Sequence, residues 1–342
     1  MKLNSIKITS IVTFILILSM LISICSFAAE PIKLVMASSG RGPGDPITDS
    51  GQAWKEAIEE QSNGEIIVEY FGRSELGGER DMLEGVQLGT IDLFQISTGV
   101  ASNLAPELDL FSLPFLFLNR EQCEEVEFGP IGKEIVAYAD KVEGLKGLMI
   151  GGAGWRMPMN RVRPIESLKD FKDLKMRVME VPMMVDAYKT LDARPVPMAF
   201  PELYLALKLG TVDGQENSPA ISYAGSMHEV CGYYTTLPIF VDLSIFLVND
   251  KLWESLSPEH QKIISDTVKI GVEKMNQVFE DEDKKALVAM EEAGVEVYRM
   301  PISEMAPFVE ATNAIWEDAL PQFPKRIQEL ALEIKEIGEK YK

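Results

Sequence analysis

Two short segments of the chain match almost residue for residue, and they constrain what it can fold into. Residues 88–92 (LGTID) and 209–213 (LGTVD) lie 121 positions apart. In each, a glycine follows a helical pattern and precedes a run typical of a strand. Glycine readily adopts the left-handed backbone conformation that ends a helix. Gly89 and Gly210 therefore predict two units of similar helix-to-strand construction.

The regions around these segments alternate between strand and helix patterns. The first region predicts strands at 32–37, 65–71 and 91–96 and helices at 50–61 and 79–88; the second predicts strands at 148–152 and 174–178 and helices at 182–191 and 202–209. Such alternation is typical of the α/β class with a largely parallel sheet. Ligands bind beyond the strand ends of such sheets, so two facing lobes would enclose a cleft.

The C-terminal quarter reads as helix. Ser257 is a suitable N-cap, and Pro258 suits the first helical position. If the following apolar pattern is continuous, residues 258–293 form one helix of ~54 Å, long enough to brace both lobes. The alternative is two helices with a break near 281–283. Residues 304–340 predict further amphipathic helix, broken by prolines.

Composition and charge exclude several classes of function. Asp and Glu number 53 against 33 Lys and Arg, a net charge of −20 that disfavours nucleic-acid binding. The chain has two histidines, His228 and His260, too few for a His-rich metal site or Ser-His-Asp chemistry. It also has no phosphate-binding loop with its lysine. We predict no metal, no cofactor and no nucleic-acid partner.

The first 28 residues have the features of a signal peptide. Lys2 and Lys7 precede an apolar run at 11–24, and small residues lead to a cleavage site after Ala28. The run is short for a membrane span, although a retained anchor is the alternative, and a lipid on Cys25 is another possibility. The mature protein is expected in the periplasm or at the outer face of the cytoplasmic membrane.

Cysteine usage says little more. After cleavage the chain keeps Cys123 and Cys231, far apart in sequence. A disulfide between them is an alternative in an oxidising compartment. Two separate buried thiols are the favoured prediction, because a disulfide framework would use more cysteines.

Two arginines are candidate ligand-binding residues. Arg177 lies in a short apolar strand at 175–179, where a guanidinium needs a partner. That partner is either an internal carboxylate or the carboxylate of a ligand held by two parallel hydrogen bonds. Arg156 follows a glycine-rich stretch at 151–154, which suits a hinge as well as a binding loop.

Several polar and aromatic residues near strand ends are further candidates. Asn217 follows the second matched strand and is either a ligand contact or a turn residue. Ser97 ends the first matched strand, and Phe200 is either a pocket floor or a core residue. Glu180 and Glu216 are candidate paired carboxylates for glycoside hydrolysis, with no pattern that fixes their separation.

The order of several segments resembles one known family. These segments are residues 76–80, 113–117, 154–161, 174–178, 195–207 and 212–217. They resemble the solute-binding proteins of tripartite ATP-independent periplasmic (TRAP) transporters, which bind C4-dicarboxylates, sialic acid, sugar acids and keto acids. The resemblance implies a two-lobed periplasmic-binding-protein (Venus-flytrap) fold in which a long C-terminal helix spans both lobes. We expect lobe I at 29–153 and about 243–282, and lobe II at 154–242 and about 283–342.

The resemblance also implies roles for individual residues. In the family, the arginine matching Arg177 forms the main salt bridge to the ligand carboxylate and the one matching Arg156 assists. Asn217 matches a residue that orients this contact, and Phe200 matches one that lines the pocket. The full set of predicted ligand-binding residues is Arg177, Arg156, Asn217, Phe200, Ser97, Glu180, Ser38 and Trp155.

The expected function is capture of a small organic carboxylate, a dicarboxylate, keto acid or sugar acid, for delivery to the membrane permease subunits of a TRAP transporter. A monomer is expected, without enzymatic activity. Met179 stands where the family usually has proline, and residues 95–98 lack the acid typical of sialic-acid binders, which favours a smaller or more apolar acid. The alternatives are a binding protein of an ATP-driven importer, a sensor, or an exported hydrolase using Glu216 and Glu180.

Overall fold

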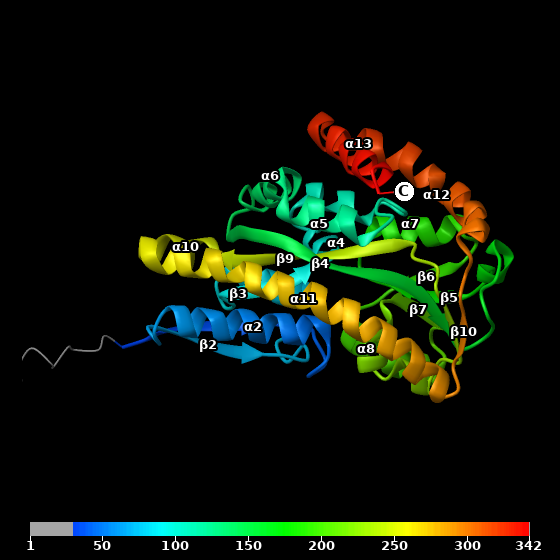
Figure 1. Cartoon of the computed structure of the whole chain (residues 1–342), viewed down its shortest axis with the longest axis horizontal. Coiled ribbons are helices and arrows are strands. Elements are labelled where there is room, and N and C mark those ends of the chain that lie inside the picture. Colours follow the sequence, from blue (N-terminus) through cyan, green and yellow to red (C-terminus); the bar gives the residue numbers. More distant parts are fainter. Residues whose placement is uncertain (1–29, 342) are drawn as a thin grey trace, which may run out of the picture.

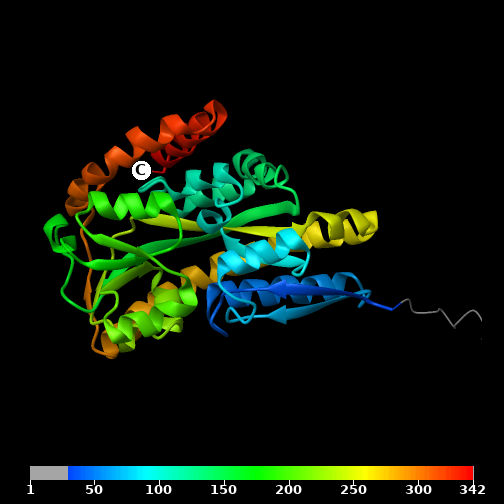
Figure 2. The same ribbon diagram turned by 180° about the vertical axis from the view of Figure 1, so that it is seen from behind.

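The computed structural model describes residues 30–341 of the chain. Within them, a ten-stranded mixed sheet carries helices on both faces (Figures 1 and 2). The strands are β1 Ile32–Ala37, β2 Ile66–Phe71, β3 Leu93–Ser97, β4 Leu145–Asn160, β5 Lys175–Val178, β6 Arg194–Pro197, β7 Gly214–Asn217, β8 Tyr233–Thr235, β9 Phe240–Asn249 and β10 Glu296–Tyr298. The α-helices are α2 Pro46–Gln61, α3 Glu79–Leu88, α4 Thr98–Ala101, α5 Arg120–Phe128, α6 Pro130–Ala139, α7 Pro182–Thr190, α8 Phe200–Leu209, α9 Pro219–Ala224, α10 Asp250–Ser255, α11 Pro258–Glu292, α12 Ala306–Ala319 and α13 Lys325–Glu339.

The two matched segments end helices as predicted. Gly89 follows α3 with φ 79° and Gly210 follows α8 with φ 74°, both in the left-handed region. Each leads into a strand of a parallel group: β1 pairs with β2 and β3, and β5 pairs with β6 and β7. We call β1–β3 with α2 and α3 the first unit, and β5–β7 with α7 and α8 the second unit.

Two long strands join the units and correct the prediction of a largely parallel sheet. β9 pairs antiparallel with β3 and β4, and β4 pairs antiparallel with β7. The predicted strand at 148–152 is the middle of the 16-residue β4. The glycines of β4 do not mark a strand end. They lie where helix α11 approaches the strand closely. A Cβ on Gly151 or Gly154 would lie 2.3 Å from Val272 or 2.7 Å from Phe279 of α11.

Helix α11 is one continuous helix of 35 residues, which confirms the first of the two alternatives (Figure 1). Its N-terminal half packs on α2, where Ser50 Oγ donates to the Gly271 carbonyl at 2.8 Å. Its C-terminal half packs on the second unit, with Met290 in the same apolar cluster as Leu203. At the expected break, Asp283 accepts a hydrogen bond from the α9 backbone at Ala220, 2.9 Å away. The helix therefore braces both units.

The last two helices pack on different parts of the molecule. α12 packs against α7 of the second unit, whereas α13 packs on α5, which belongs to the expected lobe I (Figure 1). Gln122 of α5 donates to the Ile334 carbonyl of α13 at 2.6 Å, and Arg326 pairs with Glu134 of α6 at 2.7 Å. The lobe boundaries remain a proposal, and these contacts favour assigning α13 to lobe I rather than lobe II.

Two predictions concern residues away from the sheet. Cys123 and Cys231 are both buried free thiols, in separate apolar clusters. The predicted signal peptide and its cleavage after Ala28 lie outside the described residues. No helix within residues 30–341 is long and apolar enough to cross a membrane.

Candidate functional site

A pocket lies where β4, β5, β7 and β9 meet the N-terminal ends of α3 and α8. It contains about 480 Å³ of space free of protein atoms, part of it open to solvent. Both units contribute to it. Its lining residues are Ser39, Ile47, Glu79, Val100, Arg156, Arg177, Met179, Glu180, Met198, Ala199, Phe200, Asn217, Ile221 and Asp242.

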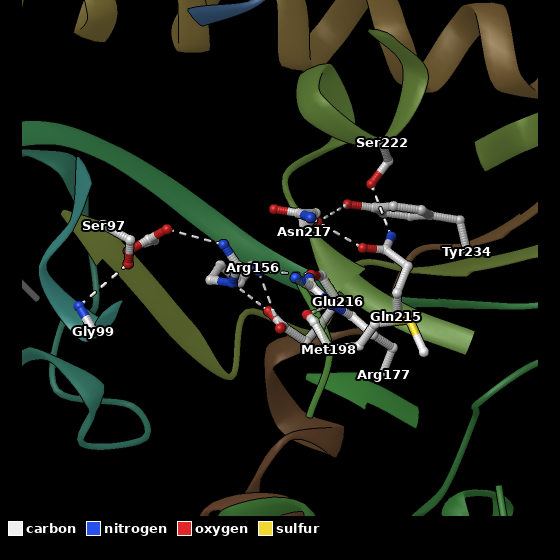
Figure 3. A network of polar contacts seen from close by, with 11 residues as sticks. Ser97, Gly99, Arg156, Arg177, Met198, Gln215, Glu216, Asn217, Ser222 and Tyr234 are labelled. Atoms are coloured by element: carbon white, nitrogen blue, oxygen red, sulfur yellow. Dashed lines mark hydrogen bonds and ion pairs between the residues drawn. The ribbon is translucent and has the colours of Figure 1, made fainter. Parts of the chain in front are cut away.

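Arg177 projects from β5 as a buried cation without a carboxylate partner. Only 2% of its surface is exposed. Its Nε donates to the Met198 carbonyl at 2.8 Å, and within residues 30–341 the guanidinium has no other hydrogen bond and no ion pair (Figure 3). Burial lowers the pKa of Arg177 to about 10, although Glu216 acts in the opposite direction. The two terminal nitrogens are therefore available to an anion in the pocket.

Arg156, by contrast, is occupied by the protein itself. Its Nε and Nη2 donate to the Glu216 carboxylate, and Nη1 donates to Asp242 Oδ2 at 2.9 Å (Figure 3). Burial lowers the pKa of Arg156, but the attraction of Glu216 and Asp242 outweighs it and leaves the pKa above its ordinary value. In this geometry Arg156 neutralises two carboxylates beside Arg177, and its assisting role in ligand binding stays a prediction.

Asn217 is held in place at the end of β7. Its Nδ2 donates to Gln215 Oε1 at 3.1 Å, and Gln215 in turn donates to Ser222 Oγ at 3.1 Å. Tyr234 donates its hydroxyl hydrogen to the Asn217 carbonyl at 3.0 Å (Figure 3). The amide that faces the pocket is thus positioned before any ligand arrives, which reduces the entropy lost on binding.

Phe200 lies between two guanidinium groups. The Arg177 guanidinium carbon is 5.8 Å from the ring centroid, and that of Arg41 is 4.3 Å away. Arg41 Nη2 also donates to the Phe200 carbonyl at 3.1 Å. Arg41 belongs to the loop before α2 and Phe200 begins α8, so this contact joins the two units beside the pocket.

Two acidic side chains, Glu79 and Asp242, line another part of the pocket. Glu79, the first residue of α3, accepts a hydrogen bond from Ser39 Oγ at 2.8 Å. Asp242 of β9 accepts one from Ser97 Oγ at 2.5 Å. Burial, reinforced by the nearby Asp242, raises the pKa of Glu79 to about 7. This carboxyl therefore changes charge near neutral pH.

The eight residues predicted as ligand contacts divide into three groups. Arg177, Arg156, Asn217, Phe200 and Glu180 all line the pocket. Ser97 lies behind the lining residues, where it holds Asp242. Ser38 and Trp155 do not line the pocket, and we do not retain them in the site. Side chains alternate along a strand, so Trp155 points away from the pocket that Arg156 faces, and Ser38 Oγ instead accepts from the Gly40 backbone.

The residues that sequence reasoning missed are mainly acidic. Asp242 interrupts the apolar sequence of β9, the same signal that singled out Arg177 in β5. Glu79 was interpreted only as a helix N-terminal acid, and its position at the start of α3 agrees with that interpretation. Its burial against Asp242 depends on chain packing that no local pattern records. No metal-binding cluster occurs among residues 30–341.

Glu79 is expected to make the stability of the protein depend on pH. Its pKa is about 7 in the folded protein against an ordinary 4.5, so the folded state binds the proton more tightly than the unfolded state. The contribution of this group to stability is therefore fully present below pH 4.5 and is lost as pH rises from there through 7, by roughly 2–3 kcal/mol. Chemical denaturation at pH 5.5 and 8.5 should show a smaller pH difference for Glu79→Gln than for the wild type. An equal difference in both proteins would contradict this assignment.

Comparison with known proteins identifies the family. The family model "DctP: Bacterial extracellular solute-binding protein, family 7" matches residues 37–322. The uncharacterised protein YiiZ of Salmonella typhimurium is 31% identical, over 82% of this chain and 85% of YiiZ. The 2,3-diketo-L-gulonate-binding periplasmic protein YiaO of Escherichia coli is 30% identical, over 80% of this chain and 83% of YiaO.

Solved structures agree with the sequence matches and confirm the predicted two-lobed α/β fold. A TRAP periplasmic solute-binding protein of a Polaromonas species, bound to D-erythronate, superimposes with a TM-score of 0.83 at 28% identity, covering 89% of this chain and 98% of that one. Another from Xanthobacter autotrophicus, with bound β-D-galacturonate, gives 0.81 at 29% identity, covering 88% and 99%. The chain therefore belongs to family 7 of the bacterial extracellular solute-binding proteins, the family of TRAP solute-binding proteins.

Proposed function

We propose that this protein captures a small organic carboxylate outside the cytoplasm and delivers it to the permease of a TRAP transporter. The observation that carries the proposal is the buried guanidinium of Arg177, which faces the pocket with two unpaired nitrogens. A buried cation without a partner is unfavourable, whereas a carboxylate would satisfy it with two charge-assisted hydrogen bonds. Relatives support this class of ligand, since three of the four named above are described with diketogulonate, erythronate and galacturonate.

Binding is coupled to closure because both units line the pocket. Ile47 and Glu79 come from the first unit, and Arg177 and Asn217 from the second. A ligand that contacts both units favours the closed arrangement over an open one. Release then requires the membrane partner to stabilise the open arrangement.

The site is organised for binding rather than catalysis. Glu216, the carboxylate considered for hydrolysis, is fully buried and bonded through both oxygens to Arg156. It is therefore unavailable as a general acid or base. We further propose that residues 1–28 are removed on export and that the mature protein acts as a monomer.

Thermal unfolding of residues 29–342 tests the proposal. D-Erythronate and D-galactonate are compared with erythritol and galactitol, which resemble them but lack the carboxylate. A ligand present at 100 times its dissociation constant should add about 2.7 kcal/mol of stability, so at least one acid should raise the unfolding temperature while its alcohol does not. Equal shifts from acid and alcohol, or no shift from a wider set of carboxylates, would refute the proposal.

A further inference from the structure

The pocket offers one free cation to a ligand, although two arginines line it. Arg156 directs three of its nitrogens at Glu216 and Asp242. Of the two, Arg177 is the one whose terminal nitrogens are unpaired within residues 30–341. Arg156 lies between Ser97 and Arg177 in Figure 3. A ligand carboxylate therefore has one place to be held by a guanidinium fork.

Carboxylates outnumber arginines in and around this pocket. Glu79, Glu180 and Asp242 line it, and Glu216 lies directly behind Arg156. Neither Glu79 nor Glu180 forms an ion pair within residues 30–341, since Glu79 is bonded only to Ser39. With every group ionised, these four carboxylates and two arginines carry a charge of −2 before any ligand enters. One ligand carboxylate can be balanced by Arg177. A second would find no free arginine in the lining and would lie near Glu79, Glu180 or Asp242.

We infer that the pocket selects hydroxylated monocarboxylates over dicarboxylates, with Glu79 as the residue that determines this specificity. The ligand carboxylate binds Arg177, and ligand hydroxyl groups face Glu79 and Asp242. A hydroxyl group both donates and accepts hydrogen bonds. It can therefore pair with the carboxyl group of Glu79 or Asp242, whereas a second ligand carboxylate cannot donate to either. This inference rests on the proposed function and narrows its substrate class.

The surroundings of Glu79 couple ligand binding to a proton. Its charge interacts with Asp242 of β9, Arg156 of β4 and Arg177 of β5, and Ser39 of the loop after β1 donates a hydrogen bond to it. A bound anion neutralises the attraction of Arg177, so binding favours the protonated form of Glu79. The affinity for a monocarboxylate should therefore fall by up to about tenfold per pH unit above pH 7. The neutral carboxyl would also donate a hydrogen bond to a ligand hydroxyl.

Two pairs of acids that differ at one end test the inference. D-Galactonate and galactarate share their hydroxyl configuration but carry one and two carboxylates, and D-erythronate and meso-tartrate form the shorter pair. Calorimetric titration of each acid is carried out with the wild type, Glu79→Gln and Glu84→Gln between pH 5.5 and 8.5. Glu84 is an exposed residue of the same helix, paired with Arg80 at 3.7 Å, so its variant controls for the change in total charge. Thermal unfolding without ligand verifies that each variant folds.

The inference predicts that the wild type binds the monocarboxylate of at least one pair at least tenfold more tightly than its dicarboxylate at pH 8. Glu79→Gln should bring the two affinities within about threefold and remove the pH dependence, and Glu84→Gln should change neither. Equal or tighter dicarboxylate binding by the wild type, or an unchanged ratio in a folded Glu79→Gln protein, would overturn the inference and leave the proposed function intact. Failure of all four acids to bind would overturn the inference, and the proposed function would fall with it only if the wider set of carboxylates also gave no thermal shift.

Discussion

Replacing Arg177 by methionine is expected to weaken carboxylate binding by about 10²–10³-fold or more. The variant loses two charge-assisted hydrogen bonds of roughly 1.5–3 kcal/mol each and leaves the ligand carboxylate buried without a partner, a loss of about 3–5 kcal/mol. Arg177→Lys should lie between the wild type and this variant, because it keeps the charge but not the planar fork. Calorimetric titration with the acid that gives the largest thermal shift provides the measurement.

The stability of the same variant separates a ligand-binding role from a structural one. Arg177 is buried with a single hydrogen bond, to Met198, so exchange for an apolar side chain of similar length should leave the free energy of unfolding unchanged or higher. Arg194→Ala is the matched control, since Arg194 is exposed on the neighbouring strand β6 and pairs with Asp173 at 2.5 Å. The Arg194→Ala variant should bind the acid with the affinity of the wild type. Undiminished binding by Arg177→Met, or a strong loss of stability in the absence of ligand, would contradict the assignment.

Replacing Arg156 by methionine should instead destabilise the folded protein by about 3–5 kcal/mol at pH 8, because it strands two carboxylates. The side chain of Glu216 has no exposed surface and that of Asp242 is 19% exposed. Without the arginine, their folded-state pKa values rise further above those of the unfolded chain. The variant should therefore regain stability as pH falls towards 5, where the folded state takes up protons. Denaturant unfolding at both pH values measures this.

A second substitution checks the cause of that loss. Arg156→Met combined with Glu216→Gln removes one of the stranded charges and should recover about half of the lost stability at pH 8. This account would be refuted if Arg156→Met alone lowered the free energy of unfolding by less than about 1 kcal/mol, or if it lowered it equally at pH 5 and pH 8.

The sequence predicted the elements whose signals are local. Gly89 and Gly210 marked helix ends because a left-handed cap needs glycine, and the N-cap Ser257 with Pro258 marked the start of α11, which begins at Pro258. Arg177 stood out because a guanidinium in a buried strand requires a partner. Each of these interpretations depends on a few adjacent residues and on the physical limits of one backbone conformation or one buried charge.

The distinction between the two arginines could not be predicted, because it depends on distant parts of the chain. Arg156 is neutralised by Glu216 and Asp242, which lie 60 and 86 residues away. They meet because β4 pairs with both β7 and β9. The sequence contains all three charges but not the register that brings them together. The same holds for Glu79, whose local pattern indicated only the start of a helix.

The direction of the central strands was missed for a related reason. In the sequence, the glycine-rich stretch at 151–154 suits a hinge or a binding loop, because glycine weakens strand patterns. In the folded protein these glycines allow α11 to approach β4 closely, at Val272, Met275 and Phe279. An apolar run alone does not tell whether a strand pairs parallel or antiparallel.

A crystal structure of the mature protein with the acid that binds most tightly tests the central claim most directly. We predict that the two oxygens of the ligand carboxylate accept hydrogen bonds from the two terminal nitrogens of Arg177, at about 2.7–2.9 Å. Arg156 should keep its contacts with Glu216 and Asp242. A ligand whose carboxylate lies on Arg156 instead, or on neither arginine, would contradict the account.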